Sequence, residues 1–195
     1  TIIASIIALK QDSIKLRLAY STIGQLAYIV LATAILAPYS ILAAVLHLAF
    51  HALGKIMLFL SAGIIATRVN VKYVSEMNGI STSLPYTSLL LSLGAIIMVG
   101  LPPTIGFISK WFLIQGIIDA DMYILVAVII LSTILNAAYY FPMIYKPFFG
   151  PSNNTFRYKE DMFLVLPVAL IGLISVVLFF TAETFIIFIE QQILL

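Results

Sequence analysis

Two histidines and a lysine stand at a regular spacing within a long apolar segment. His47, His51 and Lys55 follow one another at intervals of four residues, so a helix carries all three on one face. Histidine exchanges a proton near neutral pH. Removal from water disfavours the charged form of lysine and brings its proton exchange toward the same range. The row therefore predicts a relay for protons wherever water connects the three groups.

Metal binding is the competing interpretation of two histidines four residues apart. Catalytic zinc sites use three protein ligands, whereas the apolar segment around His47 and His51 contains no Asp, Glu or Cys. Lys55, one turn further on, adds a positive charge that opposes a bound cation. We therefore predict no metal. The sequence also shows no nucleotide-binding loop and no Ser/His/Asp arrangement, so we expect no cofactor and no catalytic reaction in this chain itself.

A second lysine within an apolar segment lies close to two consecutive prolines. Lys110 comes seven residues after Pro103, and Pro102 and Pro103 interrupt a helix because they lack N–H donors and clash with the preceding turn. Such a break frees backbone carbonyls that can accept hydrogen bonds from a protonated lysine. Thr104 and Ser109 add hydroxyl groups nearby. A charge at membrane depth indicates function by default; the alternative is a proline kink that only packs.

Polar side chains also occur in two neighbouring apolar segments. They are Tyr20, Ser21, Thr22, Gln25 and Tyr28 in residues 18–37, and Asn136, Tyr139 and Tyr140 in residues 122–145. These groups are candidates to hold water between the basic groups, and Tyr20, Asn136 and Tyr139 are our candidates for supporting residues. Hydrogen bonding between helices is an equal alternative for them.

The composition excludes several classes of protein. Of the 195 residues, 63% are hydrophobic and 9% are charged, against roughly 45–50% and about 25% in soluble domains. This excludes a soluble domain and a disordered chain. A net charge of +2 argues against nucleic-acid binding. The absence of cysteine excludes disulfides, iron–sulfur clusters and a cysteine nucleophile. The lipid bilayer is the predicted surrounding.

The apolar segments predict an all-α integral membrane protein with a partial first helix and about five full transmembrane helices. They are residues 1–9, 18–37, 41–66, 86–118, 122–145 and 162–182. Residues 86–118 are too many for one straight helix across a core of about 30 Å, so the two prolines predict a single discontinuous helix. We assign residues 1–182 to one membrane domain and residues 183–195 to a tail that lies in the membrane interface.

The distribution of charge supports this division. Eight of the ten Lys and Arg residues fall in the breaks at residues 10–17, 67–84 and 146–161, and the alternate breaks hold none. Alternate breaks lie on opposite sides of a membrane, so all eight lie on one side. The positive-inside rule makes that side the cytoplasm, or the matrix of a mitochondrion. Two spans in residues 86–118 would move the last basic loop to the other side.

Three motifs, in this order, resemble a known family. They are LAYSTIGQLAYI at residues 18–29, HLAFHALGKIMLFLSAG at 47–63 and GLPPTIGFISKWFL at 100–113. They are similar to segments of the antiporter-like proton-translocating subunits of respiratory complex I, membrane-bound hydrogenases and Mrp-type multisubunit cation/proton antiporters. Among these, the D protein of the Mrp type is favoured by NAAYYFPMIYKPFFG at residues 136–150. The resemblance extends over nearly the whole chain.

The resemblance implies a fold of fourteen membrane helices built from two inverted five-helix repeats, each with a broken helix. This chain then corresponds to the second inverted repeat and the last helix. The resemblance makes Lys110 the lysine of the second broken helix, a gate of the proton channel. It places three residues on the hydrophilic axis that links two half-channels, namely His47, His51 and Lys55. Lys15 matches the family's basic position before LAYST.

The first repeat is missing from this sequence, together with the glutamate–lysine pair that the family carries there. The sequence opens at Thr1 inside an apolar segment. We therefore expect either a longer protein of which this chain is a part, or a partner chain that supplies the first repeat. The other expected partners are further membrane subunits of a multisubunit complex, the lipid bilayer, protons and Na⁺.

Three hypotheses for function remain. The leading one is a proton-conducting subunit of a multisubunit Na⁺/proton antiporter in a bacterial plasma membrane. The alternative is a proton-pumping subunit of respiratory complex I, an NADH:quinone oxidoreductase, or of a related membrane hydrogenase, with the mitochondrial inner membrane as a second location. The third is a structural membrane scaffold, which tolerance of substitution at Lys55 and Lys110 would reveal.

Overall fold

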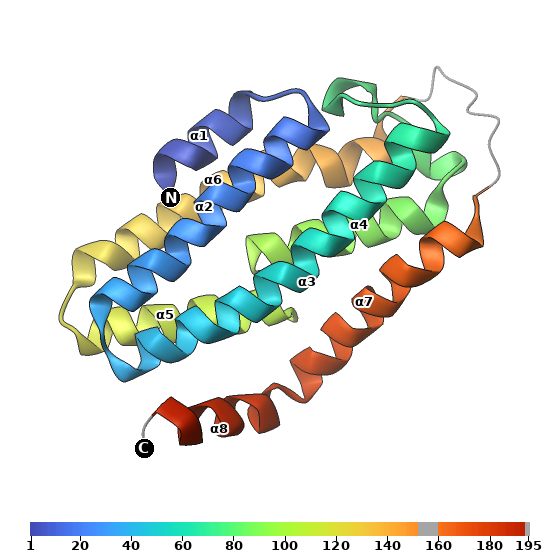
Figure 1. The fold of residues 1–195 in the computed structure, drawn as a ribbon. Helices are drawn as coiled ribbons and strands as arrows, with labels where there is room; N and C mark the ends of the chain where they lie inside the picture. The colour runs from blue at the N-terminus through green and yellow to red at the C-terminus, as the bar shows by residue number, and fades with distance from the viewer. Residues whose placement is uncertain (152–159, 194–195) are drawn as a thin grey trace.

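The computed structural model describes residues 1–151 and 160–193, and within these ranges the chain is almost entirely helical. Figure 1 shows the arrangement. The α-helices are α1 (Ile2–Lys10), α2 (Ile14–Ile35), α3 (Pro38–Arg68), α4 (Pro85–Val99), α5 (Ile105–Asp119), α6 (Tyr123–Phe149), α7 (Met162–Phe180) and α8 (Ala182–Ile193). Two short 3-10 helices, η1 (Val74–Glu76) and η2 (Ile80–Thr82), lie between α3 and α4. The all-α prediction is confirmed.

The first two complete helices begin earlier than predicted. α2 begins at Ile14 rather than at residue 18, so Lys15 and Arg17 belong to its first turn and not to a loop. α3 begins at Pro38 rather than at residue 41. The fixed φ of proline and its missing N–H suit the first position of a helix, so Pro38 starts α3.

α6 also extends further than predicted. It continues through two prolines to Phe149, so Lys146 lies in its last turn and not in a loop. Membrane helices tolerate internal proline because neighbouring groups satisfy the freed carbonyls. Two other basic residues of the predicted loop 146–161, Arg157 and Lys159, lie outside the described residues.

The predicted discontinuity in residues 86–118 is confirmed, because α4 ends at Val99 and α5 begins at Ile105. Gly100 ends α4 with a φ of 80°, a left-handed conformation that residues with a side chain adopt only at a cost. Gly106 is required for a different reason, since a Cβ atom there would collide with the carbonyl of Ile97. Each half is about 22 Å long, so both are needed for one crossing.

α3 is the central helix of the molecule. It runs diagonally across Figure 1, with α1 and α2 on one side and α7 and α8 on the other. It packs against α2, α4, α5, α7 and α8, while α1 packs against α2 and α6. Different faces of α3 therefore contact most of the other α-helices in the described part of the chain.

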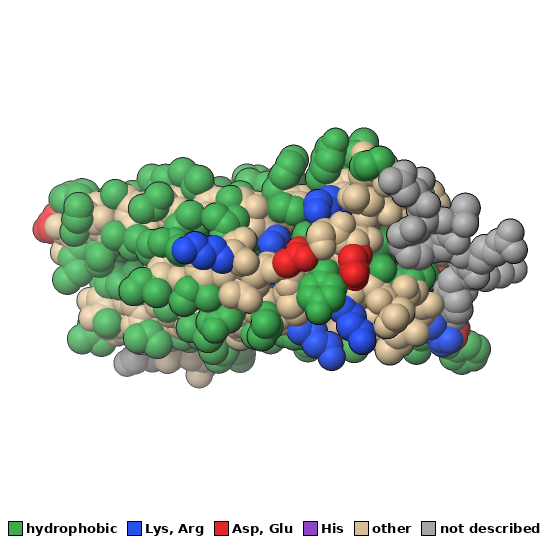
Figure 2. Space-filling view, turned by 90° about the horizontal axis from the view of Figure 1, so that it is seen from above, with side chains coloured by type: hydrophobic (Ala, Val, Ile, Leu, Met, Phe, Trp, Pro, Cys, Tyr) green, Lys and Arg blue, Asp and Glu red, His purple; other side chains and the backbone are tan. Residues whose placement is uncertain are grey.

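The outer surface is largely apolar. Within the described residues, α2, α3, α6 and α7 are long and apolar enough to cross a membrane. Large side chains such as Val30, Ile124 and Leu173 are more than half exposed. Figure 2 shows hydrophobic side chains over much of one face. Most of its basic and acidic side chains lie between the middle and one end, and an acidic side chain lies at the other end. This distribution is typical of a protein whose middle is surrounded by hydrocarbon.

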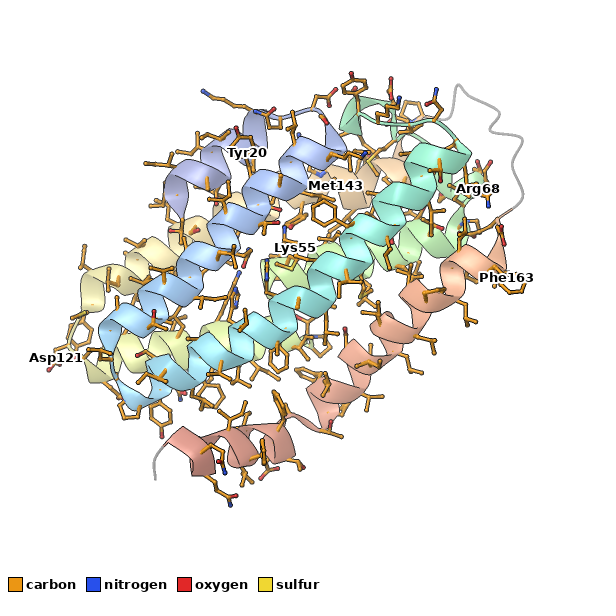
Figure 3. The ribbon with its side chains drawn as sticks, in the orientation of Figure 1. Tyr20, Lys55, Arg68, Asp121, Met143 and Phe163 are labelled. Atoms are coloured by element: carbon orange, nitrogen blue, oxygen red, sulfur yellow. The ribbon has the colours of Figure 1, made fainter. Side chains whose placement is uncertain are left out.

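The two ends of the molecule differ in charge and in their loops. Figure 3 places Arg68 and Asp121 at opposite ends. At the first end, Arg68 forms an ion pair of 2.8 Å with Asp161. The carboxylate of Glu160 accepts the backbone N–H of Thr87 at 2.6 Å and so caps the start of α4. The loops at the basic end are thus tied to the helices that they connect.

The predicted tail forms a helix that packs on the protein. α8 lies against α3 and α7, and the ring of Phe185 is centred 6.2 Å from that of Phe50. Ala182 and Ile189 are buried. A position in the membrane interface, the assignment of residues 183–195 to a separate tail and the identity of the chain as a second inverted repeat stay predictions.

Candidate functional site

Lys55 lies in the interior at the middle of α3, and its side chain is directed toward α2 and α6. Its Nζ donates to the carbonyl oxygen of Leu18 at 3.0 Å, to the hydroxyl of Ser21 and to the hydroxyl of Tyr140 at 3.3 Å. The hydroxyl of Tyr140 in turn donates to Ser21 Oγ at 3.0 Å. Figure 3 shows Lys55 enclosed between the helices. The lysine is 6% exposed and is held entirely by neutral oxygen atoms.

His47 lies two turns before Lys55 on the same face of α3. Its Nε2 is 3.1 Å from Gln25 Oε1 on α2, and its Nδ1 is 2.9 Å from Ser109 Oγ on α5. The ring of Tyr28 is centred 5.6 Å away. Both ring nitrogens of this buried histidine therefore have partners, and the partners come from two different helices.

His51 stands between His47 and Lys55 along α3. Its ring is stacked on that of His47, with centroids 6.1 Å apart and an interplanar angle of 19°. The side chain is 8% exposed, and its Nε2 has no hydrogen-bond partner within the described part of the chain. Leaving a buried polar nitrogen without a partner costs about 1–3 kcal/mol. The predicted row on one face of α3 is thus present, and its middle member is the least satisfied.

Lys110 reaches back across the helix break to the end of α4. Its Nζ donates to the carbonyl oxygens of Val99 at 2.6 Å and Met98 at 3.4 Å. The last carbonyls of a helix have no helical N–H partner and carry its partial negative charge. The Nζ also lies 5.2 Å from the ring centre of Tyr28. The expected contact between this lysine and carbonyls freed before the prolines is therefore observed.

Tyr28, which lies beside Lys110, connects that lysine to α6. Its hydroxyl accepts from Asn136 Nδ2 at 3.3 Å. The Oδ1 of Asn136 accepts from the hydroxyls of Tyr139 at 3.0 Å and Ser5 at 3.1 Å. The ring of Tyr139 is centred 4.6 Å from that of Tyr140, the partner of Lys55. Asn136 and Tyr139 therefore belong to the buried polar line, as does Ser109 through His47.

Three predicted supporting residues do not join this line. Lys15 is exposed in the first turn of α2. Tyr20 is partly buried and packs against the apolar cluster of α1, α2, α3, α4 and α6. Thr104 is buried, but its hydroxyl donates to Leu101 O at 2.7 Å and so stabilises the break itself. Their support of the basic residues stays a prediction.

One face of α2 carries buried polar residues beyond those that we selected as supporting residues. Arg17, Ser21, Gln25 and Tyr28 are buried along it, at intervals of four, four and three residues. Arg17, which we placed in a loop, donates to the carbonyl oxygen of Tyr139 at 2.9 Å. Their helical spacing in the sequence could have indicated that these residues share one face of α2.

Comparison with known proteins places the chain in a family. The family model described as "NADH:quinone oxidoreductase/Mrp antiporter, TM" matches residues 1–136. NADH-quinone oxidoreductase subunit N of Desulforudis audaxviator is 34% identical over 188 residues, which cover 89% of this chain and 38% of that protein. The chain spans about a third of the length of the curated relatives that it matches.

Solved structures show the same fold. A chain of the membrane-bound sulfane sulfur reductase, an archaeal respiratory membrane complex, superposes with a TM-score of 0.86 at 27% identity, covering 94% of this chain and 37% of that one. A chain of the Mrp complex from Dietzia sp. DQ12-45-1b gives a TM-score of 0.79 at 18% identity, covering 94% and 43%. The second likeness concerns the fold alone. With its apolar helices and these matches, the chain is an integral membrane protein that belongs to the NADH:quinone oxidoreductase/Mrp antiporter transmembrane family.

Proposed function

We propose that this chain conducts protons along the buried line from Lys110 to Lys55 as part of a multisubunit membrane complex. The observation that carries the proposal is the burial of two lysines and two histidines in a helical membrane domain, namely Lys110, His47, His51 and Lys55. A charge in such a place is costly and typically marks an ion or proton pathway. Within the described residues, no three His, Asp or Glu side chains lie together as a group that could hold a metal ion.

The contacts of the two lysines suit groups that gain and lose a proton. The carbonyls of Val99 and Met98 stabilise the ammonium form of Lys110. Lys55 faces the hydroxyls of Ser21 and Tyr140, which both donate and accept hydrogen bonds. A hydroxyl can therefore pass a proton to or from the lysine without becoming charged overall.

His47 and His51 lie between the lysines and couple them. A charge on one member of the row repels a charge on the next, and this repulsion is strong at low dielectric. The stacked rings place such charges close together. Protonation of Lys110 therefore favours release of a proton from a residue further along the row. Proton movement is thus linked to the protonation of Lys110 at one end and of Lys55 at the other.

We infer the orientation of the chain in the membrane from its charged ends. Arg68 and Asp121 lie at opposite ends (Figure 3). Lys72 follows Arg68 in the loop after α3, and Asp119 ends α5 two residues before Asp121. By the positive-inside rule we assign the first end to the cytoplasm of a bacterium, or to the matrix if the protein is mitochondrial. The remaining half of the transport unit is supplied by a further segment or by a partner subunit.

Exchange of protons for Na⁺ is the coupling that the motifs favour. Redox-linked pumping is the second candidate, and the 34% identity to a subunit named NADH-quinone oxidoreductase subunit N supports it. In vesicles containing the intact complex, an imposed Na⁺ gradient drives proton movement in the first case, and an electron donor drives it in the second. The same assay decides between the two.

Substitution of the lysines tests proton conduction itself. Lys110→Ala and Lys55→Ala are each introduced into the intact complex, and the pH inside vesicles is followed after energisation. We expect translocation to fall by about 100-fold or more, the range that positioned proton donors contribute. Lys10→Ala is the matched control, because Lys10 is exposed at the end of α1. Normal translocation in both test variants would overturn the proposal.

A further inference from the structure

The side-chain amide of Gln25 is oriented by a group that can only accept a hydrogen bond. Its Nε2 donates to the carbonyl oxygen of Met98 at 3.3 Å. Because a carbonyl has no proton to give, the NH₂ end of the amide must face Met98, and Oε1 must face the other way. Lys110 donates to the same carbonyl, so this oxygen is fixed at the helix break from two sides.

This orientation decides where the proton of His47 lies. Gln25 Oε1 is 3.1 Å from His47 Nε2, and an amide oxygen only accepts. Nε2 must therefore carry hydrogen whether the ring is neutral or charged. We infer that Gln25 is a positioning residue which holds neutral His47 as the Nε2–H tautomer, so that the histidine takes up and releases its proton at Nδ1, through Ser109. This inference rests on the proposed function, because it names the exchanging atom of that pathway.

Ser109 is placed to serve both states of His47. Its Oγ is 2.9 Å from His47 Nδ1 and 3.2 Å from the carbonyl oxygen of Gly106. When the ring is neutral, the serine hydroxyl donates to Nδ1. When the ring is charged, Nδ1–H donates to Oγ, and the hydroxyl donates to Gly106 instead. Either state leaves no ring nitrogen of His47 unpaired, so the change of charge needs only a rotation of one hydroxyl.

The proton balance at this pair is simple. A proton that reaches Oγ of Ser109 is matched by transfer of the serine hydroxyl proton to Nδ1. The serine stays neutral, the ring gains one positive charge, and release reverses these steps. Because Nε2 stays protonated, a proton does not enter the ring at one nitrogen and leave at the other. The proton of His47 is exchanged on the side of α5, the helix that carries Ser109 and Lys110. Transfer of a proton toward His51 also starts from Nδ1.

The tautomer can be read directly by nitrogen NMR. The intact complex is labelled with ¹⁵N-histidine, and a His47→Asn variant identifies the signals of His47 by their loss. In the unaltered protein we expect neutral His47 to show a protonated Nε2 and an unprotonated Nδ1. Gln25→Leu removes the acceptor and shifts the ratio of tautomers toward Nδ1–H by about tenfold, the weight of one hydrogen bond. Gln25→Glu supplies a carboxylate acceptor and restores Nε2–H.

Two results would overturn the inference. One is a Gln25→Leu protein that keeps the tautomer ratio of the unaltered protein; Gln191→Leu, at an exposed position of α8, gives the reference for an unrelated glutamine. The other is a Ser109→Ala protein that translocates protons at the normal rate, where we expect a fall of about tenfold with the Nε2–H tautomer retained. Normal translocation in the lysine variants would instead refute the proposed function and leave the tautomer result standing.

Discussion

Lys110 Nζ donates to the carbonyl oxygen of Val99, the last residue of α4, at 2.6 Å. The two residues belong to the two halves of one interrupted helix. The interruption exposes the carbonyl, and the carbonyl holds the lysine in the interior. A buried cation and a broken helix are thus two parts of one arrangement, in which the negative end of α4 compensates the charge that α5 brings into the membrane.

A first prediction separates a transport role for Lys55 from a structural one. Lys55→Met keeps an unbranched side chain, one atom shorter than that of lysine, and removes its charge. Keeping a charge away from water costs free energy, and an apolar side chain at the same place avoids this cost. Ser21 and Tyr140 remain hydrogen-bonded to each other. We therefore expect the free energy of unfolding to be unchanged or higher, while proton translocation falls by about 100-fold.

Thermal unfolding of the detergent-solubilised complex and acidification of vesicles measure these two quantities on the same preparation. Lys10→Met is the control for the loss of a lysine, since Lys10 is exposed. A scaffold whose lysine only supports the fold would give the reverse result, namely lower stability with any remaining folded protein fully active.

A second prediction concerns the glycine that ends α4. Gly100→Ala forces a side chain into a backbone with φ of 80° and brings a Cβ atom to within 2.9 Å of Lys110 Cδ. A left-handed conformation costs about 1–2 kcal/mol for such a residue, and the lysine must move as well. We expect a lower unfolding temperature together with slower translocation.

The matched control for this change is Gly63→Ala on α3. A Cβ atom at Gly63 meets nothing within 4 Å, and alanine is favoured over glycine inside a helix by about 1 kcal/mol. Stability is therefore expected to rise there without a change in transport. Equal effects of Gly100→Ala and Gly63→Ala on the unfolding temperature would contradict the prediction, because they would show that a Cβ atom at residue 100 causes no strain at the break.

The sequence predicts those parts of the site that depend on local spacing. The face shared by His47, His51 and Lys55 follows from helical periodicity alone. The carbonyl contacts of Lys110 follow from the prolines a few residues before it. Both relations lie within one or two helices that are continuous in the chain, so no knowledge of packing between distant helices is required.

Contacts between helices could not be predicted in this way. Gln25 meets His47 only because α2 crosses α3, and it meets Met98 because α4 ends at the same depth. Tyr20 was selected by residue type, whereas the buried face of α2 passes through Ser21 instead. The choice between Tyr20 and Ser21 depends on which face of α2 packs inward. Polar residues occur at both positions, so residue type alone does not mark that face.

A third prediction concerns the start of α4, the first half of the broken helix. Glu160 accepts the backbone N–H groups of Tyr86 at 3.0 Å and Thr87 at 2.6 Å, and the hydroxyl of Thr87 at 2.5 Å. It thus caps the N-terminus of α4 from a distant part of the chain. Glu160→Ala removes this cap and its favourable interaction with the helix dipole, at a cost of about 1–2 kcal/mol.

Thermal unfolding detects that loss as a lower midpoint, and Glu190→Ala on α8 serves as the control for removal of a carboxylate. Translocation per folded complex is expected to stay normal, because Glu160 lies at the basic end of the molecule and not in the buried polar line. An unchanged midpoint for Glu160→Ala would mean that solvent or another group caps α4 equally well.

A final prediction tests the hydroxyl groups around Lys55. Tyr140→Phe removes an oxygen that accepts from Lys55 Nζ at 3.3 Å and donates to Ser21 Oγ at 3.0 Å, while the aromatic ring remains. The lysine keeps Ser21 and the carbonyl of Leu18, so loss of one net hydrogen bond should slow translocation by about tenfold. Vesicle acidification measures this effect, and Tyr86→Phe, at an exposed position of α4, is the control. A normal rate for Tyr140→Phe, with Ser21→Ala slowed, would assign the exchange of the Lys55 proton to the serine hydroxyl alone and remove α6 from the pathway at this point.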